Sequence, residues 1–406
     1  MTDETMGTME LKKYKLGKIL ELQRGYDLTY TEMQKGDVVV AGSNGIIGCH
    51  NIEKSNTPCI TVGRSGSVGK VHFYDGPTWA HNTALFVKDF KENNPKFLYY
   101  FLKNLHLDTM FGQSSSVVPS LDRKVVHSLT VPFISDISKQ QRIAYLLSDY
   151  DKKIELNRAI NHNLEAMAKQ LYDYWFVQFD FPNEEGKPYK SSGGKMVWNE
   201  KLKRDIPDNW DASNICKVAD ILSGGTPSKA IATYWENGNL PFFGPTDYNG
   251  NIFQIETADH ITQEGLEHCA SSLFEDGIII ITARGSIGKL VIVGTPMAMN
   301  QSCYALRSKK EEFEYLYFLA IQLVECLKAK GSGSVFKSII TSDIENSILC
   351  IADTHTITHF CEKVKPIFQK VKENTKEIVA LTKQRDELLP LLMNGQVSVN
   401  YDLSDD

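Results

Sequence analysis

The chain repeats itself, and this internal repeat constrains its fold more than any other feature of the sequence. The segment Arg64–Lys70 (RSGSVGK) recurs as Arg284–Lys289 (RGSIGK), which is one residue shorter. Three further pairs of segments match in the same order: Pro77–Thr83 with Pro296–Ser302 at an offset of 219 residues, Phe97–Phe101 with Tyr315–Leu319, and Ser114–Val117 with Ser332–Val335. The shared order indicates a duplicated unit.

Nearer the start of each copy the offset is closer to 200 residues. Leu16–Gly25 lies over Ile215–Gly225, and Gly36–Gly42 lies over Gly238–Gly244. The second copy therefore carries an insertion of about twenty residues, which we expect around Thr233–Gly250.

Each copy opens with roughly 130 residues of short apolar runs broken by Gly, Asn, Ser and Pro. The runs Val38–Ala41, Cys59–Val62 and Gly277–Thr282 predict buried strands. The segments Phe97–Leu105 and Phe313–Lys328 predict helices. Each copy is therefore expected to fold as an α+β domain rich in loops.

Each copy then ends in a long helix whose apolar positions alternate in steps of four and three residues, which is a heptad seam. At an offset of 217 residues the two seams superimpose, and Asn157 falls on Asn374. The first seam comprises Ile143, Leu147, Tyr150, Ile154, Asn157, Asn161, Leu164, Ala168, Leu171 and Trp175. The second comprises Phe360, Val364, Ile367, Val371, Asn374, Ile378, Leu381, Arg385, Leu388 and Leu392.

A helix of about 35 residues is about 50 Å long, and so narrow an apolar stripe cannot stabilise it alone. We therefore expect the two helices to pair with each other. Asn157, Asn161 and Asn374 either fix the pairing register at a cost in stability or form a wet, imperfect patch, and the sequence favours neither. Pro366 marks either the first turn of the second helix or a kink, and Pro390 marks a kink near its end.

The predicted fold class is α+β, with two similar globular domains joined by two long antiparallel helices that form a coiled coil with approximate twofold symmetry. The expected segments are a first domain at 1–137, a first helix at 138–180, a second domain with a linker at its start at 181–353, a second helix at 354–395, and a C-terminal tail at 396–406.

Motifs of known catalytic or nucleotide-binding chemistry are missing from the sequence. The loop that ends in Gly69-Lys70 fails the phosphate-loop pattern, because Arg64 stands at its first glycine and Val71 follows the lysine. The sequence has no nucleophile elbow, HExxH or triad signature, and the eight cysteines do not have zinc-ligand spacing. A duplicated chain without a catalytic constellation is best interpreted as a binding module.

The charge pattern puts a condition on nucleic-acid binding. The chain carries a net charge of −6. Residues 1–137 have 15 Lys and Arg against 14 Asp and Glu, whereas residues 181–353 have 16 against 22. DNA binding therefore requires a locally basic surface or partners that supply phosphate contacts.

The chain has no apolar run long enough for a membrane span, no signal peptide at its start, and scattered cysteines, so we expect a cytoplasmic protein.

Several motifs together resemble the specificity subunits of type I restriction-modification enzymes. The resemblance covers nearly the whole chain, and the segment Arg385–Gly395 is its most specific part. The other matching segments are Gly42–Gly45, Gly63–Gly69, Gln140–Ile143, Pro207–Trp210 and Tyr234–Trp235. Two departures, Thr356–His359 in place of the Gln-Gln-Arg-Ile start and Arg385 in the seam, leave the start of the second helix open.

The resemblance implies a non-catalytic protein. Each globular domain would be a target recognition domain that recognises one half of a bipartite target in double-stranded DNA. The helices would set the spacing and dock two methyltransferase subunits, which methylate adenine N6. This chain would hold no cofactor itself, because S-adenosylmethionine, ATP and Mg would belong to the methyltransferase and restriction (motor-nuclease) subunits.

Candidate DNA contacts follow from side-chain chemistry, because Arg or Lys suits guanine, Asn or Gln suits adenine, and Ser or Lys suits phosphate. We select Ser43, Asn44, Arg64, Ser65, Ser67 and Lys70 in the first domain, and Asp247, Tyr248, Arg284, Ser286, Lys289, Asn300 and Gln301 in the second. The repeated loops fit tight turns that are shared for folding equally well. A motif common to both domains also suits phosphate positioning better than recognition of two different sequences.

The serine-rich stretches Gln113–Ser116 and Gly331–Ser334 fit solvent loops better than DNA-facing loops.

A rival from another class is a coiled-coil protein–protein scaffold with two binding domains and no nucleic acid, which the net negative charge would suit. A self-contained DNA methyltransferase is a third alternative, and it would bind S-adenosylmethionine on this chain alone.

Overall fold

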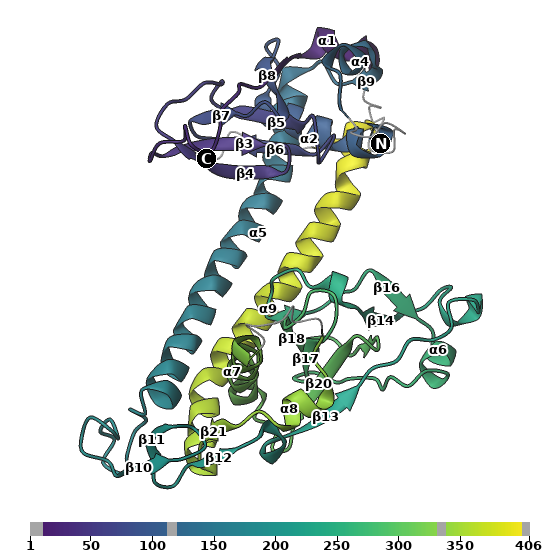
Figure 1. Cartoon of the computed structure of the whole chain (residues 1–406). Coiled ribbons are helices and arrows are strands. Elements are labelled where there is room, and N and C mark those ends of the chain that lie inside the picture. Colours follow the sequence, from purple (N-terminus) through teal and green to yellow (C-terminus); the bar gives the residue numbers. More distant parts are fainter. Residues whose placement is uncertain (1–10, 112–119, 331–337, 400–406) are drawn as a thin grey trace, which may run out of the picture. The chain divides into compact units, whose positions relative to one another are not determined.

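The computed structural model describes residues 11–111, 120–330 and 338–399 (Figure 1). The serine-rich stretches named above lie outside these residues. The chain divides into two compact units, with Met1–Lys153 and Leu381–Asp406 in unit 1 and Ile154–Ala380 in unit 2. Each long helix contributes one part to unit 1 and the rest to unit 2.

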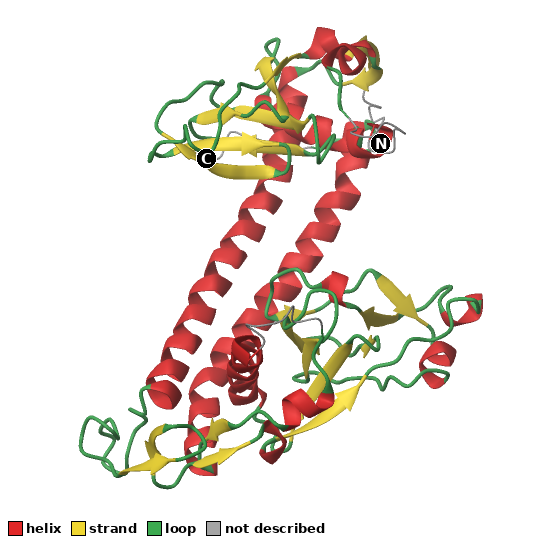
Figure 2. Cartoon of the chain, viewed as in Figure 1, coloured by secondary structure: helices red, strands yellow, loops and turns green. Residues whose placement is uncertain are grey.

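Unit 1 consists of short strands in two main sheets, together with short helices (Figure 2). One sheet has the order β2-β8-β5-β6, the other has the order β4-β3-β7, and β1 pairs with β9. The elements are β1 (Lys12–Lys15), α1 (Leu16–Ile19), β2 (Glu21–Arg24), β3 (Val38–Gly42), β4 (Gly45–His50), β5 (Cys59–Gly63), β6 (Val71–Tyr74), β7 (Thr78–Ala80), β8 (Ala84–Asp89), α2 (Pro95–Asn104), α3 (Leu107–Phe111), α4 (Arg123–Ser128) and β9 (Thr130–Phe133).

Unit 2 builds the same plan with additions. Its sheets have the orders β13-β20-β17-β18-β15 and β16-β14-β19, β12 pairs with β21, and β10 pairs with β11. The strands are β10 (Met196–Asn199), β11 (Arg204–Pro207), β12 (Asp211–Ser213), β13 (Ala219–Ser223), β14 (Leu240–Phe243), β15 (Phe253–Gln254), β16 (Asp259–Ile261), β17 (Ile279–Thr282), β18 (Leu290–Val293), β19 (Ala298–Met299), β20 (Cys303–Ser308) and β21 (Leu349–Ile351). The helices are η2 (Ile215–Lys217), η3 (Ala232–Tyr234), η4 (Pro245–Asp247), α6 (Gln263–Glu267), α7 (Phe313–Lys330) and α8 (Thr341–Glu345).

Matching strand pairs show that the two domains share one fold, as the repeat predicts. In unit 1, β3 pairs in parallel with β7, and in unit 2, β14 pairs in parallel with β19. The strand order β2-β8-β5-β6 recurs as β13-β20-β17-β18. The hairpin β10–β11, the edge strand β15 and the short helices η3, η4 and α6 have no counterpart in the described part of unit 1.

The insertion in unit 2 lies later than the sequence suggested. Val40 and Phe242 occupy matching ladder positions, at an offset of 202 residues. Gly63 and Thr282 donate matching backbone hydrogen bonds, at an offset of 219. The expected site, Thr233–Gly250, is therefore wrong in its first half, because most of the extra residues follow β14. They replace the two-residue turn between β3 and β4 with an excursion that carries η4 and β15.

The first long helix is α5 (Ile137–Tyr172), and a single π-helical stretch, η1 (Asp173–Val177), continues it. At its start the fully buried side chain of Gln140 accepts from the backbone N–H of Asn94 at 2.9 Å and donates to the Asn93 side chain at 2.8 Å. This amide explains the Gln-Gln-Arg-Ile motif, because it fastens α5 to the start of α2.

The second long helix, α9, runs from Thr354 to Met393. Asp353 precedes it, and its carboxylate accepts from the backbone N–H of Thr356 at 3.0 Å and from the Thr356 hydroxyl at 2.7 Å. The carboxylate therefore caps the helix. Pro366 lies well inside α9, so its assignment to the first turn is wrong.

The two long helices run antiparallel in both units. In unit 2, Asn161 donates its side-chain amide to the Val371 carbonyl at 3.3 Å and to the Thr375 hydroxyl at 3.2 Å. Asn374 donates to Asn161 at 2.9 Å, and Asn157 donates to Glu377 at 2.9 Å. All three asparagines are buried. Since each amide bonds across the helix pair, these contacts favour the register role over a wet patch.

In unit 1 the pairing continues through a charged contact. Arg385 of α9 donates to the Asp151 carboxylate at 2.5 Å, and the buried hydroxyl of Tyr100 donates to the same carboxylate at 2.5 Å. Ile143 and Leu147 of α5 share the core of unit 1 with Leu392 of α9. The fold class is thus as predicted: α+β, with two similar domains and long antiparallel helices. Among the described residues, no helix is long and apolar enough to cross a membrane.

Candidate nucleic-acid interface

Loops from distant parts of the sequence meet at one end of the unit 1 sheets. We call them loop cluster 1, which comprises residues 25–27, 42–45, 63–70 and 81–83. Thr83 connects them, because its carbonyl oxygen accepts from the backbone N–H groups of Arg64 at 2.9 Å and Ser65 at 3.1 Å. Its hydroxyl accepts from the N–H of Ser43 at 3.3 Å.

The remaining predicted residues of unit 1 lie in the same cluster. The ammonium group of Lys70 donates to the Asn44 side chain at 2.8 Å, and both residues are exposed. Ser67 is half-buried, and its carbonyl oxygen lies 1.9 Å from the position that a Cβ on Gly63 would occupy. Only glycine fits there. The structure therefore brings together all six selected residues of the first domain.

A polar chain extends loop cluster 1 beyond these residues. The guanidinium of Arg64 donates to the Asn82 carbonyl at 3.3 Å, and the Asn82 side-chain amide donates to the Asp27 carboxylate. Arg24 donates to the same carboxylate at 3.0 Å. The hydrogen bond from Asn82 is the largest cause that lowers the pKa of Asp27, and Arg24, His81 and Arg64 add smaller contributions. Because a carboxylate can only accept, Asn82 must direct its NH₂ group to Asp27.

Sequence reasoning missed Asp27, Asn82 and Thr83. The repeat held a usable signal, because the offset of 219 places Asn82 over Gln301, which was selected. Asp27 had no such signal, since its role depends on a contact with a residue 55 positions away.

Unit 2 builds the matching loops, which we call loop cluster 2: residues 224–226, 243–248, 282–289 and 300–302. Ser302 takes the place of Thr83, and its carbonyl oxygen accepts from the N–H groups of Ala283 at 2.7 Å and Arg284 at 3.2 Å. The N–H of Asn300 donates to the Phe243 carbonyl at 3.0 Å. This bond matches the one from His81 to Ala41 in unit 1.

Two selected residues of unit 2 bond within their own loops. The carboxylate of Asp247 accepts from the backbone N–H groups of Gly244 at 2.7 Å and Ala258 at 2.9 Å. The side chain of Asn300 accepts from the N–H of Ser302 at 2.9 Å. Asp247 thus holds the excursion after β14 in shape.

The other selected residues of unit 2 are more open. Lys289 lies over the ring of Tyr248, with its ammonium nitrogen 5.2 Å from the ring centre, which is a cation–π contact. Gln301 is exposed, and its side-chain oxygen accepts from the hydroxyl of Thr226, a residue that the sequence did not single out. Ser286 is also exposed. Loop cluster 2 therefore brings the seven selected residues into one region of unit 2.

The hydrogen bonds correct the alignment of the repeated loops. Arg64 and Ala283 occupy one matching position, and Ser65 and Arg284 occupy the next, since each pair donates to the carbonyl of Thr83 or Ser302. The loops have equal lengths, and the arginine moves by one residue. Glycines with positive φ fix this register, with values of 82° and 79° at positions 66 and 69 and of 75° and 72° at positions 285 and 288.

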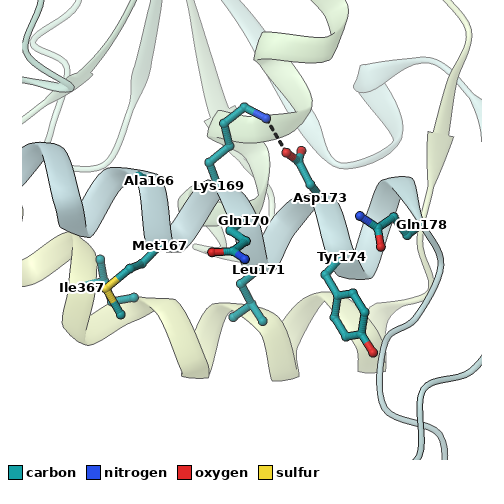
Figure 3. Close-up of a pocket in the computed structure, with 9 residues that line it drawn as sticks. All are labelled: Ala166, Met167, Lys169, Gln170, Leu171, Asp173, Tyr174, Gln178 and Ile367. Atoms are coloured by element: carbon teal, nitrogen blue, oxygen red, sulfur yellow. Dashed lines mark hydrogen bonds and ion pairs between the residues drawn. The ribbon is translucent and has the colours of Figure 1, made fainter.

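A groove lies along α5 and η1 in unit 2, with a cavity volume of about 750 Å³ (Figure 3). Met167 and Tyr174 line it and are 58% and 37% exposed. An ion pair between Lys169 and Asp173 lies on the same helix, and Ile367 is the contribution of α9. The remaining lining residues are Ala166, Gln170, Leu171 and Gln178. Exposed apolar side chains beside a π-helical turn are typical of a contact surface.

The family model for the type I restriction modification DNA specificity domain matches residues 9–166 and 207–356. The chain belongs to this family. Its two matched regions correspond to the two copies of the repeat. Specificity subunits are non-catalytic and need no cofactor of their own, and no group of three potential metal ligands occurs within the described part of the chain.

Two named relatives support the same assignment, and one solved structure shares the fold. The chain is 29% identical to the type I restriction enzyme MjaIX specificity subunit of Methanocaldococcus jannaschii, over 75% of this chain and 69% of the relative. It is 25% identical to the HindI specificity subunit of Haemophilus influenzae, over 75% and 77%. A crystal structure of the type I S subunit from M. genitalium superimposes with a TM-score of 0.62 at 17% identity, and covers 96% of this chain and 98% of that one.

The seam residues of this specificity subunit differ in burial. Thirteen of the twenty are buried: Ile143, Leu147, Ile154, Asn157, Asn161, Ala168, Trp175, Phe360, Val364, Val371, Asn374, Ile378 and Leu392. The other seven are half-buried: Tyr150, Leu164, Leu171, Ile367, Leu381, Arg385 and Leu388. Phe368 and Leu389, neighbours of two half-buried positions, are buried instead.

Proposed function

We propose that this specificity subunit gives a type I restriction-modification complex its target by binding double-stranded DNA. Each globular domain recognises one half of a bipartite, asymmetric sequence. The observation that carries this proposal is the pair of loop clusters, in which matching backbone hydrogen bonds display different side chains. A shared framework with different side chains suits two half-sites of different sequence. Because the chain acts on the DNA of its host, we assign it to the cytoplasm.

The domain assignment follows the repeat. Residues 1–137 form the first target recognition domain and residues 181–353 the second, with a linker at its start. Residues 138–180 and 354–395 form the spacer helices, and 396–406 the tail. The repeated strand order and the continuous helices α5 and α9 support these limits.

The helix pair sets the distance between the half-sites. An α-helix rises about 1.5 Å per residue, so a pairing register held by contacts across the helix pair is equivalent to a fixed length. The contacts of Asn161 with Asn374 and of Asp151 with Arg385 supply that register. Dimeric DNA-binding proteins whose half-sites lie about 34 Å or more apart use the same principle.

The DNA contacts come from the loop clusters. In loop cluster 1 they are Ser43, Asn44, Ser65, Ser67, Lys70 and Asn82, whereas Arg64 holds the loop through its bond to the Asn82 carbonyl. In loop cluster 2 they are Tyr248, Arg284, Ser286, Lys289 and Gln301. Asp247 and Asn300 act by shaping their loop, since their side chains already bond to its backbone. Partner subunits supply much of the phosphate contact, which accounts for a net charge of −6 on a DNA-binding chain.

The helices also dock two methyltransferase subunits, and the groove lined by Met167 and Tyr174 is the surface we assign to one of them. Its exposed apolar side chains support this assignment. S-adenosylmethionine belongs to the methyltransferase subunits, and ATP with Mg belongs to the restriction subunits. The chain itself transfers no methyl group and cleaves no bond.

The test is a domain exchange within the assembled methyltransferase complex. Residues 1–137 are replaced by the corresponding domain of a related specificity subunit, and methylated sites are mapped by sequencing the genomic DNA of a host that carries the complex. We expect one half of the target to change and the other half to persist. A change in both halves would contradict independent recognition, and a complex that methylates without sequence preference would exclude the proposed function.

A further inference from the structure

We propose that the two loop arginines have different tasks: Arg284 recognises a base edge in the half-site of the second domain, whereas Arg64 is a positioning residue that holds loop cluster 1. This inference rests on the proposed function and assigns a specificity determinant within it. It depends on the arginine moving by one position between two otherwise matching loops.

The backbone framework of the two loops is the same. The N–H of Gly63 donates to the Lys70 carbonyl at 2.7 Å, and the N–H of Thr282 donates to the Lys289 carbonyl at 2.9 Å. The N–H of Gly69 then donates to the Gly63 carbonyl, and the N–H of Gly288 donates to the Thr282 carbonyl, both at 2.8 Å. Successive residues on such a framework direct their side chains differently, so a shift of one residue changes where the guanidinium group lies.

The first of the two matching positions, Arg64 in unit 1 and Ala283 in unit 2, faces inward. Arg64 is half-buried, and its guanidinium donates to the Asn82 carbonyl at 3.3 Å. Its charge also helps to lower the pKa of Asp27, after the larger effects of Asn82 and Arg24. Ala283 occupies the matching place in unit 2 and is only 2% exposed. An arginine in this position is therefore engaged with its own protein.

The next position, Ser65 in unit 1 and Arg284 in unit 2, is more open to solvent. Arg284 is exposed, whereas Ser65 in the matching place is half-buried. Gly285 follows Arg284 and lies opposite Pro245, so the loop borders the excursion that only unit 2 carries. An exposed guanidinium on a loop fixed by glycines at positive φ can form the planar, two-bond contact that guanine offers in the major groove.

The experiment uses the full chain assembled with its methyltransferase subunits. Each base pair of both half-sites is replaced in turn in DNA fragments, and methyl transfer to each fragment is measured. The variants are Arg284→Ala and Arg284→Lys, together with Arg64→Ala and Arg64→Lys. Arg307→Ala is the matched control, because Arg307 is exposed on β20 of the same unit and its loss changes the charge equally.

We expect Arg284→Ala to reduce discrimination about tenfold or more at one base pair of one half-site and to leave the other half-site unchanged. Arg284→Lys should retain only part of the discrimination that Arg284→Ala loses. Arg64→Ala should slow methylation of all fragments by a common factor, and Arg64→Lys should recover much of the rate.

Three results would overturn the assignment: a uniform loss with Arg284→Ala, unchanged discrimination with that variant, or a loss confined to one base pair with Arg64→Ala. Failure of the proposed function itself would look different, because the unmodified complex would then methylate all fragments alike.

Discussion

Asn82 and Gln301 occupy matching places in the two loop clusters, but their partners differ in chemistry. Asp27 can only accept, so it fixes the Asn82 amide with NH₂ toward the carboxylate and leaves the carbonyl oxygen for a ligand. Thr226 can donate or accept, so it imposes no such choice on Gln301. Two domains with one framework can thus present different hydrogen-bonding groups through a single change in a supporting residue.

We predict that Asp27→Asn changes the base preference of the first domain. The new amide can donate to Asn82 or accept from it, so the side chain of Asn82 is free to turn over and offer a donor to DNA. Fragments that carry each alternative base in both half-sites, methylated by the assembled complex, measure the change. We expect a base that offers an acceptor to be tolerated about five- to tenfold better at one position.

The control for this prediction is Asp75→Asn, which removes the same charge from an exposed side chain of unit 1 outside loop cluster 1. If Asp27→Asn and Asp75→Asn have the same effect, the supporting role of Asp27 is wrong.

The residues of the candidate site could be predicted only in part from the sequence. Gly, Ser, Arg and Lys in repeated loops were visible, and the structure gathers them into two clusters. The shift of the arginine was hidden, because it depends on which N–H groups bond to Thr83 and Ser302. The contact of Asp27 with Asn82 was hidden for the same reason, since side-chain pairing across 55 residues leaves no periodic pattern.

At the scale of elements, the long helices were the most predictable part of the fold, because a heptad pattern follows directly from helix geometry. The pattern was less accurate in α9, where Phe368 is buried rather than Ile367. Phe368 packs against Phe253 and Phe318 of the second domain. A heptad pattern describes the contacts of a helix with one partner helix only, whereas α9 also packs against the core of the second domain.

The asparagine pair makes a quantitative prediction about helix pairing. In unit 2, Asn161 and Asn374 are buried and bonded to each other. The change Asn374→Leu therefore leaves the side-chain oxygen of Asn161 without its hydrogen-bond donor. We expect this single change to lower the free energy of unfolding by about 1–3 kcal/mol. The double change to leucine should recover most of that loss, because apolar groups then face each other.

Chemical denaturation of the single and double variants measures the coupling between the two residues. Purely additive losses would contradict a direct contact. The double variant should also reveal the register role, since leucines permit the helices to slide, and a second register would broaden the unfolding transition.

The groove on α5 predicts a contact with a methyltransferase subunit. Met167→Lys puts a charge into its apolar lining without disturbing the core, because Met167 is 58% exposed. We expect assembly with the methyltransferase to weaken about tenfold or more, measured by calorimetric titration of the full chain. Leu156→Lys is the matched control, because Leu156 is 60% exposed on the same helix but outside the groove. Equal weakening by both changes would contradict a site confined to the groove.

At the scale of the whole molecule, one gene duplication explains both the repeated fold and its asymmetry. The matching strand orders preserve the inherited framework. The excursion after β14, the hairpin β10–β11 and the displaced arginine distinguish the second domain from the first. A duplicated chain can therefore keep a common frame for two domains while each domain changes the bases it recognises.

The helix pair offers the strongest test of how such a chain measures DNA. Residues 154–160 of α5 and 375–381 of α9 lie between two cross-helix contacts, Asn161 with Asn374 and Asp151 with Arg385. Deleting both segments removes one heptad from each helix and keeps both contacts in register. The pair shortens by about 10 Å, since each residue contributes about 1.5 Å.

If the helices determine the spacing, the gap between the half-sites should shrink by about three base pairs, because ten base pairs span about 34 Å. Mapping the methylated sites of a host that carries the deleted form measures the new gap. The half-site sequences themselves should persist, because neither loop cluster is touched. A gap that stays the same would show that the DNA-bound partners, and not the helix pair, determine the distance.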